Sequence, residues 1–168
     1  KDFPEIDKAA YVGLARPVIV QNGVATTGSV MMAEPDFLDI MPLPLVQGDA
    51  RSALRDRYSL LITESEAARR FADRNPIGQR LSITLNGRTF DYHVTGVLRD
   101  IPRNSHLEID ILIPFNRTSY SDHPEFFTSY GWRGGFNYVR LRPGVTAADL
   151  APRMAAWEKR NIPRHDVG

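Results

Sequence analysis

The chain has 168 residues, a formal net charge of +1 and no cysteine. A near-neutral charge gives no large field that would attract nucleic acid or an acidic membrane surface. The absence of thiols excludes disulfide scaffolds, thiolate metal sites and cysteine nucleophiles. Hydrophobic residues make up 42% of the chain, which is enough for a packed core in one domain or two small subdomains. No stretch approaches the roughly 20 apolar residues that a membrane helix needs.

The first part of the chain predicts a β-hairpin. Residues 11–21 contain a run of β-branched side chains, which is typical of a strand, and Pro17 indicates an edge position or a bulge within it. Asn22 and Gly23 form a strong hairpin signal. Residues 24–33 therefore predict the returning strand.

A capped helix is predicted in the centre of the chain. Thr63 can cap its start, and Glu66 lies three residues later, where its side chain can reach back to the cap N–H. Ala67, Ala68 and Phe71 form an apolar stripe at helical spacing. The other elements predicted are a helix over 36–41, strands over 59–62, 80–85, 90–98, 107–114 and 136–141, an Asn86-Gly87 hairpin turn, and a helix from Thr146.

The C-terminal helix has its apolar residues on one face, because Leu150, Met154 and Trp157 recur at helical spacing. Pro152 lies inside this pattern and cannot donate a backbone hydrogen bond. We therefore expect either a helix that begins nearer Asp149 or a kink at the proline.

Four segments in this order resemble one known family. They are AEPDFLDI and PLVQGD (33–40 and 44–49), LITES and ARRF (61–65 and 68–71), NPIGQ (75–79) and VTGVLRDIPRNSH (94–106). The chain is similar over residues 6–163 to the MacB-like periplasmic core domain. This domain is the extracytoplasmic insert between the first two membrane helices of FtsX-like ABC transporter permeases.

The resemblance implies an α+β fold in two subdomains. A porter-like α/β subdomain would be split between residues 1–47 and 133–168, and a mostly β, Sabre-like subdomain over 48–132 would be inserted between them. The last strand and helix (136–162) would then pack beside the first hairpin (11–33). The chain begins with Lys1, as we expect for a fragment cut out from between two membrane helices.

The same resemblance implies a non-enzymatic role on the periplasmic or extracellular side of the bacterial inner membrane. The domain would relay ATP-driven movement of membrane helices to a periplasmic substrate or partner protein. Its partners would be the flanking membrane helices, a cytoplasmic ABC ATPase, a second permease copy and possible periplasmic adaptors, with no nucleic acid among them.

The residues themselves favour no catalytic, cofactor or metal site. The four histidines are more than four residues apart, so the short spacings of metal ligands are missing. There is no G-x-S-x-G turn and no phosphate-binding G-x-x-x-x-G-K-[ST] loop. Ser105 and His106 are adjacent, and neighbouring side chains of an extended chain point in different directions. A serine hydrolase is therefore the weakest alternative.

Two surface features are candidates for binding. We expect a partner-protein patch on the inserted subdomain that includes Arg51, Arg55, Phe126 and Phe127. The aromatic-rich segment 120–132 supports the alternative of a periplasmic module that binds a small molecule or peptide in a pocket lined by these rings.

Overall fold

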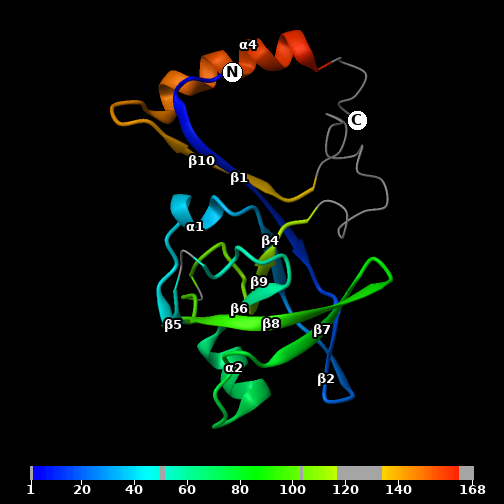
Figure 1. The fold of residues 1–168 in the computed structure, drawn as a ribbon. Helices are drawn as coiled ribbons and strands as arrows, with labels where there is room; N and C mark the ends of the chain where they lie inside the picture. Colours follow the sequence, from blue (N-terminus) through cyan, green and yellow to red (C-terminus); the bar gives the residue numbers. More distant parts are fainter. Residues whose placement is uncertain (1, 50–51, 103, 117–133, 163–168) are drawn as a thin grey trace.

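The computed structural model describes residues 2–49, 52–102, 104–116 and 134–162. Ten strands from these residues form one mixed sheet in the order β10-β1-β4-β9-β6-β8-β7-β2-β3, with β5 paired to β8 off this path (Figure 1). The α+β class is as predicted. The strands are β1 (Ile6–Ala15), β2 (Val18–Gln21), β3 (Val24–Thr27), β4 (Val30–Ala33), β5 (Leu45–Gly48), β6 (Ser59–Thr63), β7 (Arg80–Leu85), β8 (Arg88–Leu98), β9 (Ile111–Pro114) and β10 (Phe136–Leu141), and the helices are α1 (Phe37–Ile40), α2 (Glu64–Phe71) and α4 (Ala147–Asn161).

The central strands β4, β9 and β6 are buried along their whole length. Alternate residues of each strand point to opposite faces of the sheet, so these strands contribute to two separate cores. On one face Leu60 and Ile62 pack in a cluster that includes Phe71 of α2. On the other face Leu61 packs in a cluster that includes Phe37 of α1. The middle of the sheet is therefore covered on both sides.

The predicted first hairpin is wrong in part, because each of its two long strands is broken. The chain leaves the first strand at Arg16 and Pro17, and it breaks the returning strand at Gly28 and Ser29. The short hairpin β2–β3 does turn at Asn22-Gly23, as predicted, but it pairs with β7 at the far edge of the sheet. The outer segments β1 and β4 pair with each other in the register that the same turn sets, as the hairpin predicted.

The last strand lies beside the first one, as the resemblance implied. β10 pairs antiparallel with β1, and Figure 1 places these strands and α4 at one end of the molecule, with α2 at the other. Two other pairings, β4 with β9 and β2 with β7, join residues 1–47 to residues 48–132 within the same sheet. The division into subdomains at these boundaries stays a prediction.

Other elements differ from expectation as well: β1 begins at Ile6 rather than at residue 11, and β5 was not expected. The strand predicted over 107–114 begins only at Ile111. Just before it, the Asp110 side chain accepts a hydrogen bond from the Ser29 N–H at 2.9 Å, a contact with a distant segment that the alternating pattern does not reveal. Helix α4 begins at Ala147 and continues through Pro152. The alternative of a start nearer Asp149 is therefore wrong.

Candidate functional site

The predicted partner patch lies only partly within the described residues. Arg55 is exposed between β5 and β6. Arg51, Phe126 and Phe127 lie outside the described residues, as does the aromatic segment 120–132. Both the patch and the aromatic pocket therefore stay predictions.

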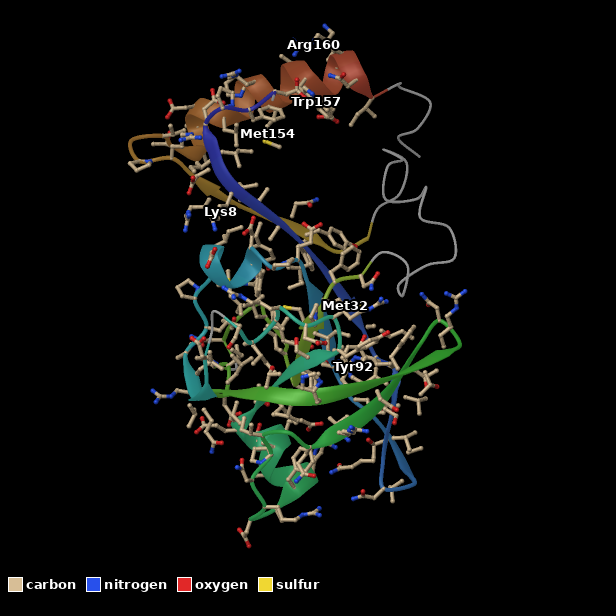
Figure 2. The ribbon with its side chains drawn as sticks, in the orientation of Figure 1. Lys8, Met32, Tyr92, Met154, Trp157 and Arg160 are labelled. Carbon is tan, nitrogen blue, oxygen red and sulfur yellow. The ribbon has the colours of Figure 1, made fainter. Side chains whose placement is uncertain are left out.

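The two ends of the described chain meet at α4. The rings of Phe3 and Trp157 lie with centroids 6.0 Å apart, and Arg153 forms an ion pair with Glu5. Figure 2 shows Met154 and Trp157 on the side of α4 that faces β1, with Arg160 on the opposite side. Met154 is nevertheless 51% exposed. We call β1, β10 and α4 the terminal unit.

Charged contacts join the terminal unit to α1. Lys8 of β1 pairs with Asp36 at 3.4 Å and also with Asp39. The hydrogen bond and positive charge of Lys8 lower the pKa of the Asp39 carboxyl below its usual value. Arg140 of β10 donates to the Asp39 carbonyl at 3.0 Å and pairs with Asp7 at 2.6 Å. Helix α1 is therefore held to both strands of the terminal unit.

Tyr138 of β10 extends this junction toward the loop after β8. Its ring meets Phe37 of α1 edge-on at 5.5 Å, and its hydroxyl lies 2.9 Å from Nε2 of His106. Burial raises the pKa of the Tyr138 hydroxyl. The Ser105 hydroxyl accepts a hydrogen bond from the Leu107 N–H at 3.1 Å. His106 and Ser105 thus have different hydrogen-bond partners among the described residues.

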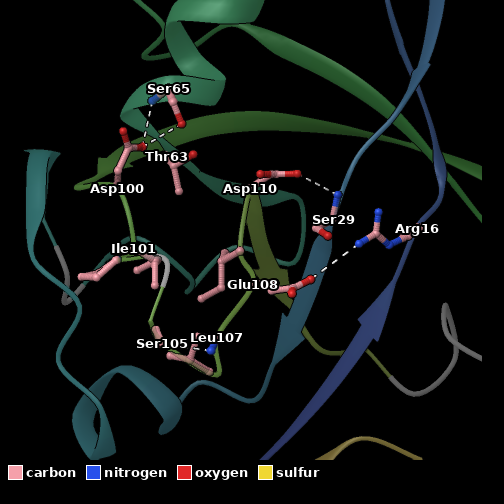
Figure 3. Close-up of a pocket in the computed structure, with 12 residues that line it drawn as sticks. Arg16, Ser29, Thr63, Ser65, Asp100, Ile101, Ser105, Leu107, Glu108 and Asp110 are labelled. Atoms are coloured by element: carbon pink, nitrogen blue, oxygen red, sulfur yellow. Dashed lines mark hydrogen bonds and ion pairs between the residues drawn. The ribbon is translucent and has the colours of Figure 1, made fainter.

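A cavity of about 540 Å³ opens at one edge of the sheet. It lies where β6 and β8 end and where β4 and β9 begin, beside the first turn of α2 (Figure 3). Its walls combine carboxylates, hydroxyls and apolar side chains. They comprise Arg16, Ser29, Thr63, Ser65, Asp100, Ile101, Pro102, Ser105, Leu107, Glu108, Ile109 and Asp110.

Hydrogen bonds hold the carboxylates of this cavity in place. Asp100 Oδ1 accepts from both the backbone N–H and the hydroxyl of Ser65, each at 2.9 Å. Asp110 Oδ2 accepts from the Ser29 N–H at 2.9 Å, and the Asp110 carbonyl accepts from the Thr63 N–H at 3.0 Å. These bonds connect the starts of β4 and β9 to the end of β6.

The predicted capping box of α2 is wrong. Thr63 occupies the cap position, but its side chain makes no cap hydrogen bond; the Ser65 N–H is satisfied by Asp100, which follows the neighbouring strand β8. Glu66 is buried and instead pairs with Arg69 and Arg70. The local sequence pattern offered no signal for Asp100, which comes from a distant segment.

Residues 1–157 match the sequence model of the MacB-like periplasmic core domain. The chain belongs to this family. No curated protein matches it significantly.

Solved structures agree with this assignment. The chain has a TM-score of 0.68 and 29% identity to a crystallised domain, assigned to a permease protein, from Porphyromonas gingivalis; the match covers 94% of this chain and 65% of that one. It has a TM-score of 0.64 and 16% identity to the periplasmic region of MacB from Actinobacillus actinomycetemcomitans, covering 94% and 68%. For the extracellular domain of the ABC-type transporter YknZ from Gram-positive bacteria, the TM-score is 0.58 with 16% identity, covering 89% and 71%.

The chain of this MacB-like family member spans less than two thirds of the Porphyromonas domain. Within the part that the structure describes, no helix has both the length and the apolar character needed to span a membrane. Among the same residues, no group of three or more histidine and acidic side chains is placed to hold a metal ion.

Proposed function

We propose that this chain is a non-catalytic outer domain of an ABC transporter permease. It relays ATP-driven movement of membrane helices to a substrate or partner protein on the periplasmic or extracellular side of the inner membrane. The family match supports this role. The partners in this proposal are the flanking membrane helices, a cytoplasmic ABC ATPase, a second permease copy and a periplasmic adaptor or substrate.

The observation that carries the proposal is the path from the chain ends into the sheet. Residues near the start of the chain pack on α4 through Phe3 and Glu5. β1 continues from this contact and is hydrogen-bonded to β10 on one side and to β4 on the other. A displacement applied at the two ends would therefore be passed to the central strands by backbone hydrogen bonds.

Helix α1 braces this path. Asp39 of this helix forms an ion pair with Lys8 of β1, and its carbonyl accepts a hydrogen bond from Arg140 of β10. Phe37 is fully buried against Tyr138 of β10. Packed cores deform little under load. The terminal unit and the middle of the sheet are expected to move together rather than independently.

The experiment measures distances between the two copies in the full permease with its ATPase in lipid nanodiscs. This chain has no cysteine, so a single spin label can be attached at Asp73→Cys, an exposed position just beyond α2. A second preparation carries the label at Ala156→Cys, an exposed position on α4. Other cysteines of the permease are first replaced.

We expect ATP, added with an ATPase variant that binds but does not hydrolyse it, to change the distance distribution at both positions. A change at Ala156 without one at Asp73 would mean that movement stops at the terminal unit, and this would overturn the relay. Identical distributions with and without ATP at both positions would overturn it as well.

A further inference from the structure

The edge cavity described above contains polar atoms with unused hydrogen-bonding capacity. Asp100 accepts two hydrogen bonds from Ser65 through Oδ1, and the Asp110 side chain accepts one from the Ser29 N–H through Oδ2. Among the described residues, the second oxygen of each carboxylate accepts no hydrogen bond. A carboxylate has about four acceptor positions, so both groups can accept donors from a molecule in the cavity.

Thr63 provides a second, independent observation. Its side chain lines the cavity, and the residue is only 2% exposed. Its Oγ1 is a buried atom without a hydrogen-bond partner among the described residues. A buried hydroxyl without a partner costs about 1–3 kcal/mol. In the view of Figure 3, Thr63 lies between Asp100 and Asp110.

The charge of the cavity favours a cation. Among the described residues, three carboxylates line it, from Asp100, Glu108 and Asp110, against one guanidinium, that of Arg16, which lies 3.6 Å from Glu108. This leaves an excess of two negative charges. Glu64, outside the lining, adds one more negative charge next to Asp100, because its Oε2 accepts a hydrogen bond from the Asp100 N–H at 3.3 Å.

The neighbouring cation does not reverse this balance. A Cβ on Gly28 would lie 3.7 Å from Arg70 Nη2 and 3.8 Å from Asp110 Oδ2, so the Arg70 guanidinium lies on the same side of Gly28 as the Asp110 carboxylate. The Arg70 guanidinium is already paired with buried Glu66. The carboxylates of the cavity are also not grouped to share a metal ion, since no such group exists among the described residues.

We propose that this cavity binds a primary ammonium group. An ammonium has three donors and no acceptor, so it pairs with carboxylates that keep an oxygen free of hydrogen bonds among the described residues, as Asp100 and Asp110 do. Ile101, Leu107 and Ile109 provide an apolar wall beside them, and the volume leaves room for a body attached to the amine. Two sources carry this chemistry, the amino terminus of a peptide and a polyamine. The proposal does not depend on the relay function.

The test is a ¹H–¹⁵N NMR titration of the chain with three probes. They are alanyl-alanine amide, its N-acetylated form without the ammonium, and 1,4-diaminobutane. The backbone amides of Ser29 and Ser65 report on the cavity, because they donate to Asp110 and Asp100. We expect saturable shifts of both amides with at least one of the two amines and none with the acetylated peptide.

The two amines distinguish the source. Saturation with alanyl-alanine amide alone assigns a peptide amino terminus, and saturation with 1,4-diaminobutane alone assigns a polyamine. Equal shifts with the acetylated peptide would overturn the proposal in favour of a neutral ligand. The absence of saturable shifts with both amines would also overturn it.

Variants test the assigned atoms. Asp110→Asn removes a charge and keeps the size of the side chain, so we expect the affinity for the amine to fall at least about tenfold. Asp73→Asn removes an exposed carboxylate outside the cavity and should leave the affinity unchanged. If the spectrum of Asp110→Asn shows a lost fold, Thr63→Val replaces it and should weaken binding severalfold. An unchanged affinity in the folded variant would overturn the proposal.

Discussion

At the scale of single residues, the most consequential feature is the buried ion pair in α2. Glu66 and Arg70 have side chains only 3% and 4% exposed. Arg70 also donates to the Thr26 hydroxyl at 3.1 Å, and its backbone carbonyl accepts from the Gln21 amide at 3.1 Å. This arginine therefore links α2 to the β2–β3 hairpin as well as to its own helix.

Replacing Glu66 with alanine leaves the Arg70 guanidinium buried without its counter-charge. We expect the free energy of unfolding to fall by about 3–5 kcal/mol, measured by urea denaturation. Glu158→Ala, at an exposed position of α4, is the control and should change it by less than about 0.5 kcal/mol. A loss below about 1 kcal/mol for Glu66→Ala would show that water reaches Arg70.

A second prediction at this scale concerns stability at high pH. Burial raises the pKa of Tyr92 to about 12, above the ordinary tyrosine value of about 10. Between these values the native state holds a proton that the unfolded state has released, so stability falls as pH rises. The contribution is complete below about pH 10 and is lost by about pH 12.

We expect Tyr92→Phe to reduce the loss of unfolding free energy between pH 9 and pH 11.5 by up to about 2 kcal/mol, measured by urea denaturation at both pH values. The comparison with the wild type is needed because burial raises the pKa of Tyr138 in the same direction. Parallel pH profiles for the wild type and Tyr92→Phe would contradict the assignment to Tyr92.

At the scale of elements, the pairing of β5 with β8 depends on two facing glycines. Gly48 and Gly96 are directly opposite in the register. Gly48 has φ +92°, and a Cβ there would lie 2.5 Å from the Thr95 carbonyl oxygen. A Cβ on Gly96 would lie 2.7 Å from the Leu61 side chain. Only glycines allow these two strands to approach each other and the core so closely.

Gly48→Ala is therefore expected to lower the free energy of unfolding by about 3 kcal/mol, from the left-handed backbone and the clash together. Gly87→Ala is the matched control, because Gly87 has φ +77° with open space around it. For this control we expect the free energy of unfolding to fall only by the cost of the left-handed backbone, about 1–2 kcal/mol. Thermal or urea denaturation measures both, and equal losses would mean that β5 moves away without cost.

At the scale of the whole molecule, one sheet passes through all the segments expected to form separate subdomains. Residues 1–47 reach residues 48–132 through the pairs β4–β9 and β2–β7, and they reach the last strand through β1–β10. Removing the middle segment would expose β4 and β2 along strand edges that are now hydrogen-bonded.

We therefore expect one cooperative unfolding transition for the chain. Calorimetry should give equal calorimetric and van't Hoff enthalpies, and circular dichroism and tryptophan fluorescence should report the same midpoint. Two separate midpoints would contradict this expectation and would favour independently folding subdomains.

Much of the local structure follows from the sequence. Asn22-Gly23 and Asn86-Gly87 turn as predicted, because their left-handed conformations, with φ between +47° and +80°, are accessible to few residues. The helix after Thr63, the strand of residues 80–85 and the last strand also lie where predicted. The cavity was not predicted, since Thr63, Asp100 and Asp110 come from three separate segments with no shared pattern.

What the sequence by itself determined is the set of short-range elements and, through four family-like segments, the membership in the MacB-like periplasmic core domain family. Those features depend on the conformational preferences of neighbouring residues. The tertiary structure alone decided that the first hairpin splits between two parts of the sheet, that Glu66 faces Arg70 rather than its helix start, and that Asp100 caps α2. Each of these depends on contacts between distant segments, where burial and charge pairing outweigh local preference.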